Sequence, residues 1–119
     1  MNILVVDDDA LQLETLRRGL KNKGYQVLEA LSGKEAVKCF ARSNMAKIDL
    51  VLSDYLMPGM NGIELVKKIR QNYGSLPVIL MTAYGEKELV IEALRNRCDS
   101  FIEKPFTLDQ LMQEIERVT

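Results

Sequence analysis

Four stretches of the sequence carry side chains that could do chemistry together, and each stretch follows an apolar run. Asp7 and Asp8 follow the first run, Asp54 a second, Thr82 a third and Lys104 a short fourth. If these groups meet, three carboxylates repel one another, and the simplest relief is a bound divalent cation. Oxygen ligands of this kind suit Mg²⁺ or Mn²⁺ rather than zinc.

The elements that must position these side chains alternate between strand and helix. Apolar runs predict strands over residues 3–6, 26–30, 48–53, 77–83 and 101–103, and apolar residues at helical spacing predict a helix after each strand. This alternation predicts one α/β domain over residues 1–119, with a five-stranded parallel sheet and five helices on both faces. Ligands of such sheets bind at the carboxyl ends of the strands, where the candidate residues are expected.

Several helix ends are marked by local signals. Gly24 is expected to end the first helix, and another helix is expected over residues 86–96. Pairs of residues three positions apart fit helix N-caps; they are Asp9 with Gln12, Ser32 with Glu35, Asn61 with Glu64 and Thr107 with Gln110.

Composition excludes several classes of protein. The chain contains no His, so Ser-His-Asp, Cys-His and zinc-histidine chemistry are ruled out. With 16 Lys+Arg against 17 Asp+Glu, the net charge of -1 does not indicate a general nucleic-acid surface. No apolar run approaches the about 20 residues that span a bilayer. Cys39 and Cys98 lack metal-ligand spacing, and we expect them to be reduced thiols in a cytoplasmic protein.

Four short motifs make the resemblance to a known family specific. They are V-D-D at residues 6–8, S-D-Y-L-M-P-G-M-N-G at 53–62, M-T-A at 81–83 and K-P-F at 104–106. In their order and in their placement at strand ends, the chain resembles a response-regulator receiver domain of bacterial two-component signalling, over essentially its whole length. The resemblance implies a flavodoxin-like fold with strand order 2-1-3-4-5.

The resemblance also implies a phosphorylation-dependent switch, a regulatory domain that assists its own phosphorylation and dephosphorylation rather than a conventional enzyme. Asp54 would accept a phosphoryl group from a phosphohistidine on a sensor histidine kinase or a phosphotransfer protein. Mg²⁺ (or Mn²⁺) would be bound by Asp8, Asp54 and the backbone carbonyl of Leu56, with Asp7 acting indirectly.

Two further residues would complete the site in such a domain. Lys104 would contact one phosphoryl oxygen and the Thr82 hydroxyl another, and the Lys104-Pro105 peptide bond is a candidate for the cis form. Thr82 and Phe101 stand at the positions of the family's switch residues, although Phe101 also fits a core position. The switch would change the face made by the helix over 86–96, the fifth strand and the last helix. That face would control an output domain or a homodimer partner, and neither nucleic acid nor a membrane is expected to bind the domain directly.

Some residues have simpler interpretations. Asp9 fits an N-cap better than a metal ligand, and Asp7 could be structural. Pro58-Gly59 and Asn61-Gly62 are interpreted as loop residues that shape the path after Asp54. Arg97 stands where many family members have Gly, and it is strained if that position requires a positive φ.

Two alternative functions need residues that the sequence lacks, and a third remains open. A flavodoxin-like flavin or nucleotide module would need a phosphate loop, and neither G-x-G-x-x-G nor G-x-x-x-x-G-K-[ST] occurs. A haloacid-dehalogenase-like phosphatase would need a second Asp where Leu56 stands. A receiver that acts only by docking, without phosphorylation, remains open.

Overall fold

The chain alternates between strands and helices, as predicted. The computed structural model describes residues 1–41, 47–83, 88, 91–92 and 95–119. The elements are β1 (Asn2–Val6), α1 (Ala10–Asn22), β2 (Gln26–Ala30), α2 (Gly33–Ala41), β3 (Leu50–Asp54), α3 (Gly62–Tyr73), β4 (Val78–Thr82), β5 (Ser100–Glu103) and α5 (Leu108–Val118). Among the helices described, none is long and apolar enough to cross a membrane.

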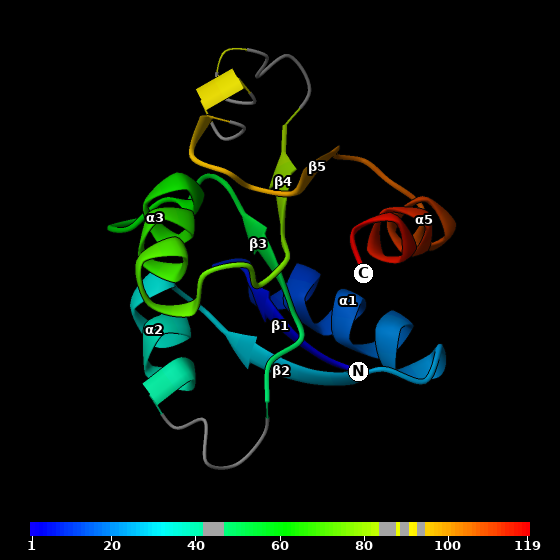
Figure 1. Ribbon diagram of the computed structural model, residues 1–119. Coiled ribbons are helices and arrows are strands. Elements are labelled where there is room, and N and C mark those ends of the chain that lie inside the picture. The colour runs from blue at the N-terminus through cyan, green and yellow to red at the C-terminus, as the bar shows by residue number, and fades with distance from the viewer. Residues whose placement is uncertain (42–46, 84–87, 89–90, 93–94) are drawn as a thin grey trace.

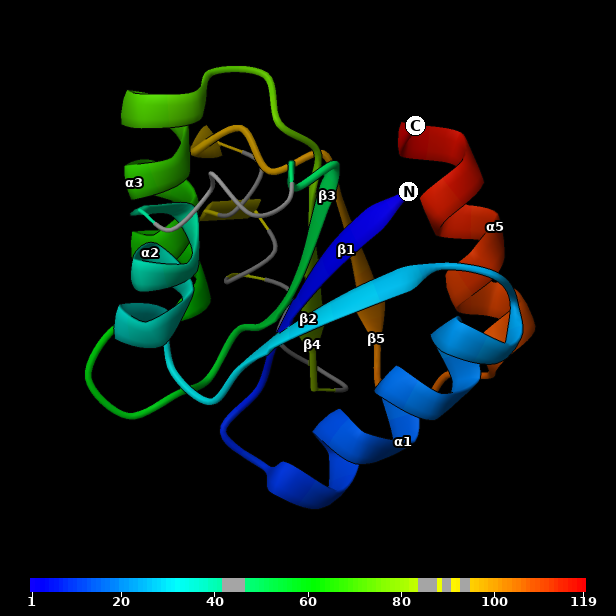
Figure 2. The same cartoon turned by 90° about the horizontal axis from the view of Figure 1, so that it is seen from below.

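The strands form one parallel sheet in the order β2-β1-β3-β4-β5. Helices α2 and α3 lie on one face of the sheet and α1 and α5 on the other (Figure 1). The same layers are seen after a 90° turn (Figure 2). The predicted α/β fold and the strand order 2-1-3-4-5 are therefore confirmed.

The central strands are apolar on both faces because helices cover both. In β3, Leu50 and Leu52 belong to the core cluster that includes α1 and α5, whereas Val51 belongs to the cluster with α2 and α3. All three are 0% exposed, and full burial of such a side chain contributes roughly 1.5–3 kcal/mol. This two-sided burial accounts for the nearly continuous apolar runs in the sequence.

The third strand lies slightly later than predicted, at Leu50–Asp54 instead of 48–53. Ile48 is buried although it precedes the strand, and Asp49 accepts a hydrogen bond from the backbone N–H of Asn2. At the other end, Asp54 pairs with Met81 and is the last strand residue. The acceptor candidate is thus held by the sheet ladder rather than by a loop.

The predicted helix caps are confirmed. Side chains cap three helices, namely Asp9 for α1, Asn61 for α3 and Thr107 for α5, the last two in reciprocal capping boxes. The start of α2 differs in detail, because Ser32 accepts from the Glu35 N–H while the Glu35 carboxylate accepts from the Leu31 N–H. Gly24 follows α1 with a φ of 95°, which glycine adopts without strain.

The helix expected over 86–96 falls partly outside the described residues. Of the residues described there, Glu88, Ile91, Glu92 and Arg95 are helical. The Asn96 N–H donates to the Glu92 carbonyl at 3.1 Å, as in a helix.

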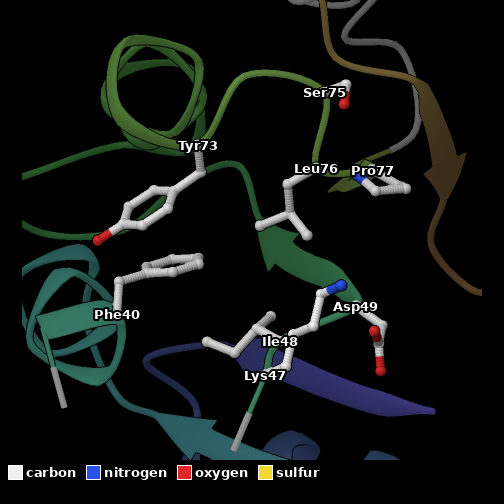
Figure 3. Close-up of a pocket in the computed structure, with 8 residues that line it drawn as sticks. All are labelled: Phe40, Lys47, Ile48, Asp49, Tyr73, Ser75, Leu76 and Pro77. Atoms are coloured by element: carbon white, nitrogen blue, oxygen red, sulfur yellow. The ribbon is translucent and has the colours of Figure 1, made fainter. Parts of the chain in front are cut away.

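At the edge where β3 and β4 begin, an aromatic contact joins the ends of α2 and α3. Phe40 and Tyr73 stack with ring centroids 4.6 Å apart. Their rings border a pocket of about 530 Å³, and Ile48 and Leu76 point into it (Figure 3). This pocket lies at the opposite edge of the sheet from Asp54.

The segment before β5 is anchored by Arg70 on α3. The Arg70 side chain is only 8% exposed and forms an ion pair with Asp99 at 2.6 Å. It also donates to three backbone carbonyls, that of Arg97 among them. Asp99 in turn accepts from the N–H of Val78, so one ion pair joins α3, β4 and the start of β5.

Arg97 has a φ of 65°, in the left-handed region. The strain anticipated for Arg97 is therefore confirmed. A side chain costs about 1–2 kcal/mol there, because its Cβ crowds the following carbonyl oxygen.

Arg97→Gly should stabilise the protein. Relief of the strain exceeds the extra flexibility that Gly gives the unfolded chain, so the free energy of unfolding should rise by about 0.5–1 kcal/mol. Urea denaturation measures it. Arg95→Gly, the same change at a helical residue, should lower that free energy by about 1 kcal/mol. Equal losses in both variants would contradict the assignment of strain.

Candidate functional site

The parallel register brings the candidate residues to one edge of the sheet. Asp54 ends β3 and Thr82 ends β4, on neighbouring strands. Asp7 directly follows β1, which pairs with β3 on its other side. Lys104 directly follows β5, and its N–H donates to the Thr82 carbonyl at 2.8 Å. The expected convergence at the carboxyl ends of the strands is present.

Three carboxylates form the centre of this site. Asp7, Asp8 and Asp54 each place a carboxylate oxygen within 4.8 Å of the others. Asp7 is fully buried, Asp54 is partly buried and Asp8 is exposed. Burial is the main cause that raises the pKa of Asp7. The nearby charges of Asp54 and Asp8 raise this pKa further, while a hydrogen bond from the Asp9 N–H lowers it in part.

Lys104 supplies the positive charge of the site. Its Nζ lies 3.1 Å from Asp54 Oδ1 and 3.8 Å from Asp7 Oδ2. The peptide bond between Lys104 and Pro105 is cis, as the motif suggested. One ammonium group balances only part of the charge of three ionised carboxylates.

The donor set fits a hard divalent cation. All three side chains offer oxygen, which Mg²⁺ and Mn²⁺ prefer. Asp7 Oδ2 is buried and accepts no hydrogen bond from the described residues, so this oxygen can still interact with a cation or with a water bound to it. The side chain of Leu56, two residues beyond Asp54, is 70% exposed.

Thr82 presents an unpaired hydroxyl. Its side chain is 2% exposed, and its Oγ1 has no hydrogen-bond partner in the described part of the chain. A buried hydroxyl without a partner loses its hydrogen bonds to water and gains none from the protein, and such groups are uncommon in native proteins. This desolvation cost indicates that the Thr82 hydroxyl is placed to form a hydrogen bond with a group that binds at the site.

Gly62 supports the acceptor strand in a way that the sequence did not reveal. It was interpreted as a loop residue, but it begins α3. A Cβ at this position would lie 2.9 Å from the Asp54 carbonyl oxygen and 3.0 Å from the Tyr55 Cα. Only glycine lets α3 approach the end of β3 so closely. The sequence feature that could have revealed this close approach is a glycine directly after the N-cap residue Asn61, at the first position of a helix.

Two other predicted residues lie outside the acidic cluster. Asp9 caps α1 through bonds from the N–H groups of Leu11 and Gln12, as its simpler interpretation had it. Phe101 lies within β5, is partly buried and packs against the core cluster that includes α2 and α3. This placement is compatible with both of its interpretations, so its switch role stays a prediction.

Comparison with known proteins matches this geometry to a family. The model of the response regulator receiver domain matches residues 3–116. The chain belongs to the response regulator receiver domain family. Receiver domains are regulatory modules of two-component systems, and this one carries the acidic cluster at which such domains typically bind Mg²⁺.

The relatives differ in how much of them the receiver domain makes up. A Chemotaxis protein CheY homolog of Campylobacter jejuni is 38% identical over 121 residues, covering 99% of this chain and 92% of the relative. A Cyclic di-GMP phosphodiesterase of Thermotoga maritima is 36% identical, covering 97% of this chain but only 30% of that protein. The DNA-binding transcriptional regulator NtrC of Escherichia coli is 34% identical, covering 97% of this chain and 24% of that protein.

Solved structures agree with the fold. A response regulator receiver domain protein from Clostridium thermocellum has a TM-score of 0.92 at 29% identity, covering 98% of this chain and 92% of that one. A chemotaxis protein CheY of Vibrio cholerae has a TM-score of 0.89 at 30% identity, covering 99% and 98% of the two chains.

Asp8→Asn should weaken Mg²⁺ binding at least tenfold, since it removes a charged oxygen from the cluster. Asp9→Asn is the matched control, because Asn caps a helix as well as Asp does and the affinity should stay within about twofold. Isothermal titration measures both. Asp9→Ala should lower the free energy of unfolding by about 1 kcal/mol without loss of Mg²⁺ affinity. The opposite pattern would mean that the roles of Asp8 and Asp9 are exchanged.

Thr82→Val should raise the free energy of unfolding by about 1 kcal/mol, because it replaces an unpaired buried hydroxyl with a methyl group of similar shape. Thr15→Val is the matched control. The Thr15 hydroxyl is exposed and donates to the Leu11 carbonyl, so this change should alter stability by less than about 0.5 kcal/mol. Destabilisation by Thr82→Val in thermal or urea unfolding would show that the hydroxyl is already satisfied.

Proposed function

We propose that this receiver domain is a phosphorylation-dependent switch in which Asp54 accepts a phosphoryl group from a phosphohistidine. The donor would be a sensor histidine kinase or a phosphotransfer protein. The observation that carries the proposal is the placement of Asp54, whose Oδ1 lies 3.1 Å from Lys104 Nζ at the edge of the sheet. A carboxylate fixed beside a cation, with its backbone in the ladder, is well placed to receive an anionic group.

The transfer requires little from the protein beyond position and charge. A carboxylate oxygen of Asp54 forms the new bond to phosphorus while the phosphorus–nitrogen bond breaks, and the electron pair of that bond stays on the imidazole of the donor. A carboxylate nucleophile has no proton to remove, so no general base is needed. Lys104 would pair with one phosphoryl oxygen, and the unpaired Thr82 hydroxyl would donate to another.

We expect Asp8, Asp54 and the backbone carbonyl of Leu56 to hold Mg²⁺ or Mn²⁺, with Asp7 acting indirectly by orienting the other ligands. When bound, the ion supplies positive charge for the phosphoryl oxygens. Asp7 Oδ2, which accepts no hydrogen bond from the described residues, supports this arrangement. Since the carboxylates repel one another, the ion also relieves the repulsion that Lys104 leaves.

Phosphorylation would pull Thr82 and Lys104 toward the new group, since it adds charge and acceptor oxygens. Lys104 continues directly from β5, the strand that contains Phe101. Movement of Lys104 would therefore be transmitted to β5 by the chain itself. The proposed readout face consists of β5, α5 and the helix expected over 86–96.

Side chains connect the two described elements of this face. The Ser100 hydroxyl donates to Glu114 and accepts from Arg117, which ties the start of β5 to α5. We propose that the face controls an output domain or a homodimer partner. We expect a cytoplasmic domain that contacts proteins rather than nucleic acid or a membrane.

Asp54→Asn should abolish phosphorylation, because an amide has no negatively charged oxygen for the attack. The parent chain, incubated with Mg²⁺ and a small phosphodonor, should gain one phosphoryl group by intact-mass spectrometry, and chelation of Mg²⁺ should prevent the gain. Asp109→Asn is the matched control at an exposed position in the first turn of α5 and should be labelled like the parent.

The outcomes separate the alternatives. Equal labelling of Asp54→Asn would place the acceptor elsewhere. A parent chain that binds Mg²⁺ but gains no mass would favour a receiver that acts by docking alone.

A further inference from the structure

A second charged site lies between α3 and the segment that leads into β5. Here a pocket of about 330 Å³ is lined by Lys67, Arg70, Gln71, Arg95, Asn96 and Arg97. These six residues are called the cationic pocket below. Because α3 ends before β4 begins and residues 95–97 precede β5, the cationic pocket lies toward the edge where the strands start. Asp54 lies at the opposite edge.

The charge of the cationic pocket is concentrated and largely unpaired. Four of its six lining residues are cations, on a chain with a net charge of -1. Arg70 is paired with Asp99. No described carboxylate forms an ion pair with Lys67, Arg95 or Arg97, all of which are exposed. Like charges held together repel one another unless an anion lies between them.

The base of the cationic pocket is rigid. The guanidinium of Arg70 makes four hydrogen bonds, one of them to the Arg97 carbonyl, which fixes the backbone that carries Arg97. Arg97 itself is held at a φ of 65°, where glycine would be unstrained. An unfavourable backbone conformation retained by an arginine is often found where the side chain has a function. Here it places a third unpaired cation at the cationic pocket.

We propose that the cationic pocket binds a small, multiply charged oxyanion of the phosphate class, such as the diphosphate group of a small molecule. All charged groups of the lining are donors, and guanidinium groups match phosphate oxygens in pairs. The amide of Gln71 offers a further donor, and the Asn96 amide keeps one N–H beyond the one that it donates to the Glu92 carbonyl. The volume is near the lower end of small-molecule sites, which suits a compact anion.

The test uses the whole chain and sodium diphosphate, with no Mg²⁺ present, so that the result does not depend on phosphorylation of Asp54. Amide NMR at about 0.15 M salt should show saturable shifts at the cationic pocket. Lys67→Gln and Arg97→Gly should each raise the dissociation constant for diphosphate about fivefold or more, since each removes one charge-assisted contact. Lys68→Gln removes a neighbouring charge of α3 that does not line the pocket, and it should change the constant by less than about twofold.

The choice of variants separates a loss of diphosphate binding from a loss of folding. Arg97→Gly is expected to be more stable than the parent, so weaker binding in that variant reports the missing guanidinium. The proposal is overturned if the shifts do not saturate, or if Lys68→Gln weakens binding as much as Lys67→Gln. The proposal is also overturned if sodium chloride at the same ionic strength produces the same amide shifts as diphosphate.

Parallel titrations distinguish the source of the anion. A nucleoside diphosphate that binds more tightly than inorganic diphosphate would assign the site to a nucleotide-like ligand, and equal affinities would assign it to the phosphate group alone. Both results support a phosphate-class site. Tighter binding of duplex DNA or of an acidic peptide, with no saturable diphosphate binding, would refute a small-molecule site.

Discussion

The rest of the structure depends on holding three carboxylates and one ammonium group at the edge of a buried sheet. Asp7, Asp8 and Asp54 place carboxylate oxygens within 4.8 Å of one another and repel one another, and Lys104 offsets only part of that repulsion. The cost is largest for Asp7, which is fully buried. This electrostatic cost is offset by the burial of apolar side chains of β1, β3 and β4 on both faces of the sheet.

The two edges of the sheet have opposite electrostatic character. The edge where the strands end is acidic, whereas the edge where they begin carries the cationic pocket and its Arg70 anchor. This separation explains how a chain with a net charge of -1 can present two strongly charged surfaces. The Arg70–Asp99 ion pair lies at the second of these edges, where Asp99 also accepts from the Val78 N–H and so joins α3 to the starts of β4 and β5.

The region that matches this chain makes up very different shares of its relatives. The chain matches nearly the whole of one chemotaxis protein and less than a third of a phosphodiesterase and of a transcriptional regulator. In this chain the connection from Lys104 through β5 to Ser100 and then to α5 provides a continuous path of covalent and hydrogen-bonded contacts.

The sequence by itself determined the alternation of elements, the helix caps and the types of side chain at the strand ends. These features arise from neighbours along the chain: apolar periodicity, capping side chains and residues that follow directly after a strand. The family resemblance also indicated the strain at Arg97, because this residue stands where many family members have Gly. Only the tertiary structure decided that Asp7 is buried, that the Thr82 hydroxyl has no partner among the described residues and that a Cβ at Gly62 would collide with the Asp54 carbonyl. The reason is that burial and pairing depend on strand register and on contacts between residues far apart in sequence. The same is true of the cationic pocket, whose three residues on α3 meet residues 95–97 only because α3 packs beside the segment that leads into β5.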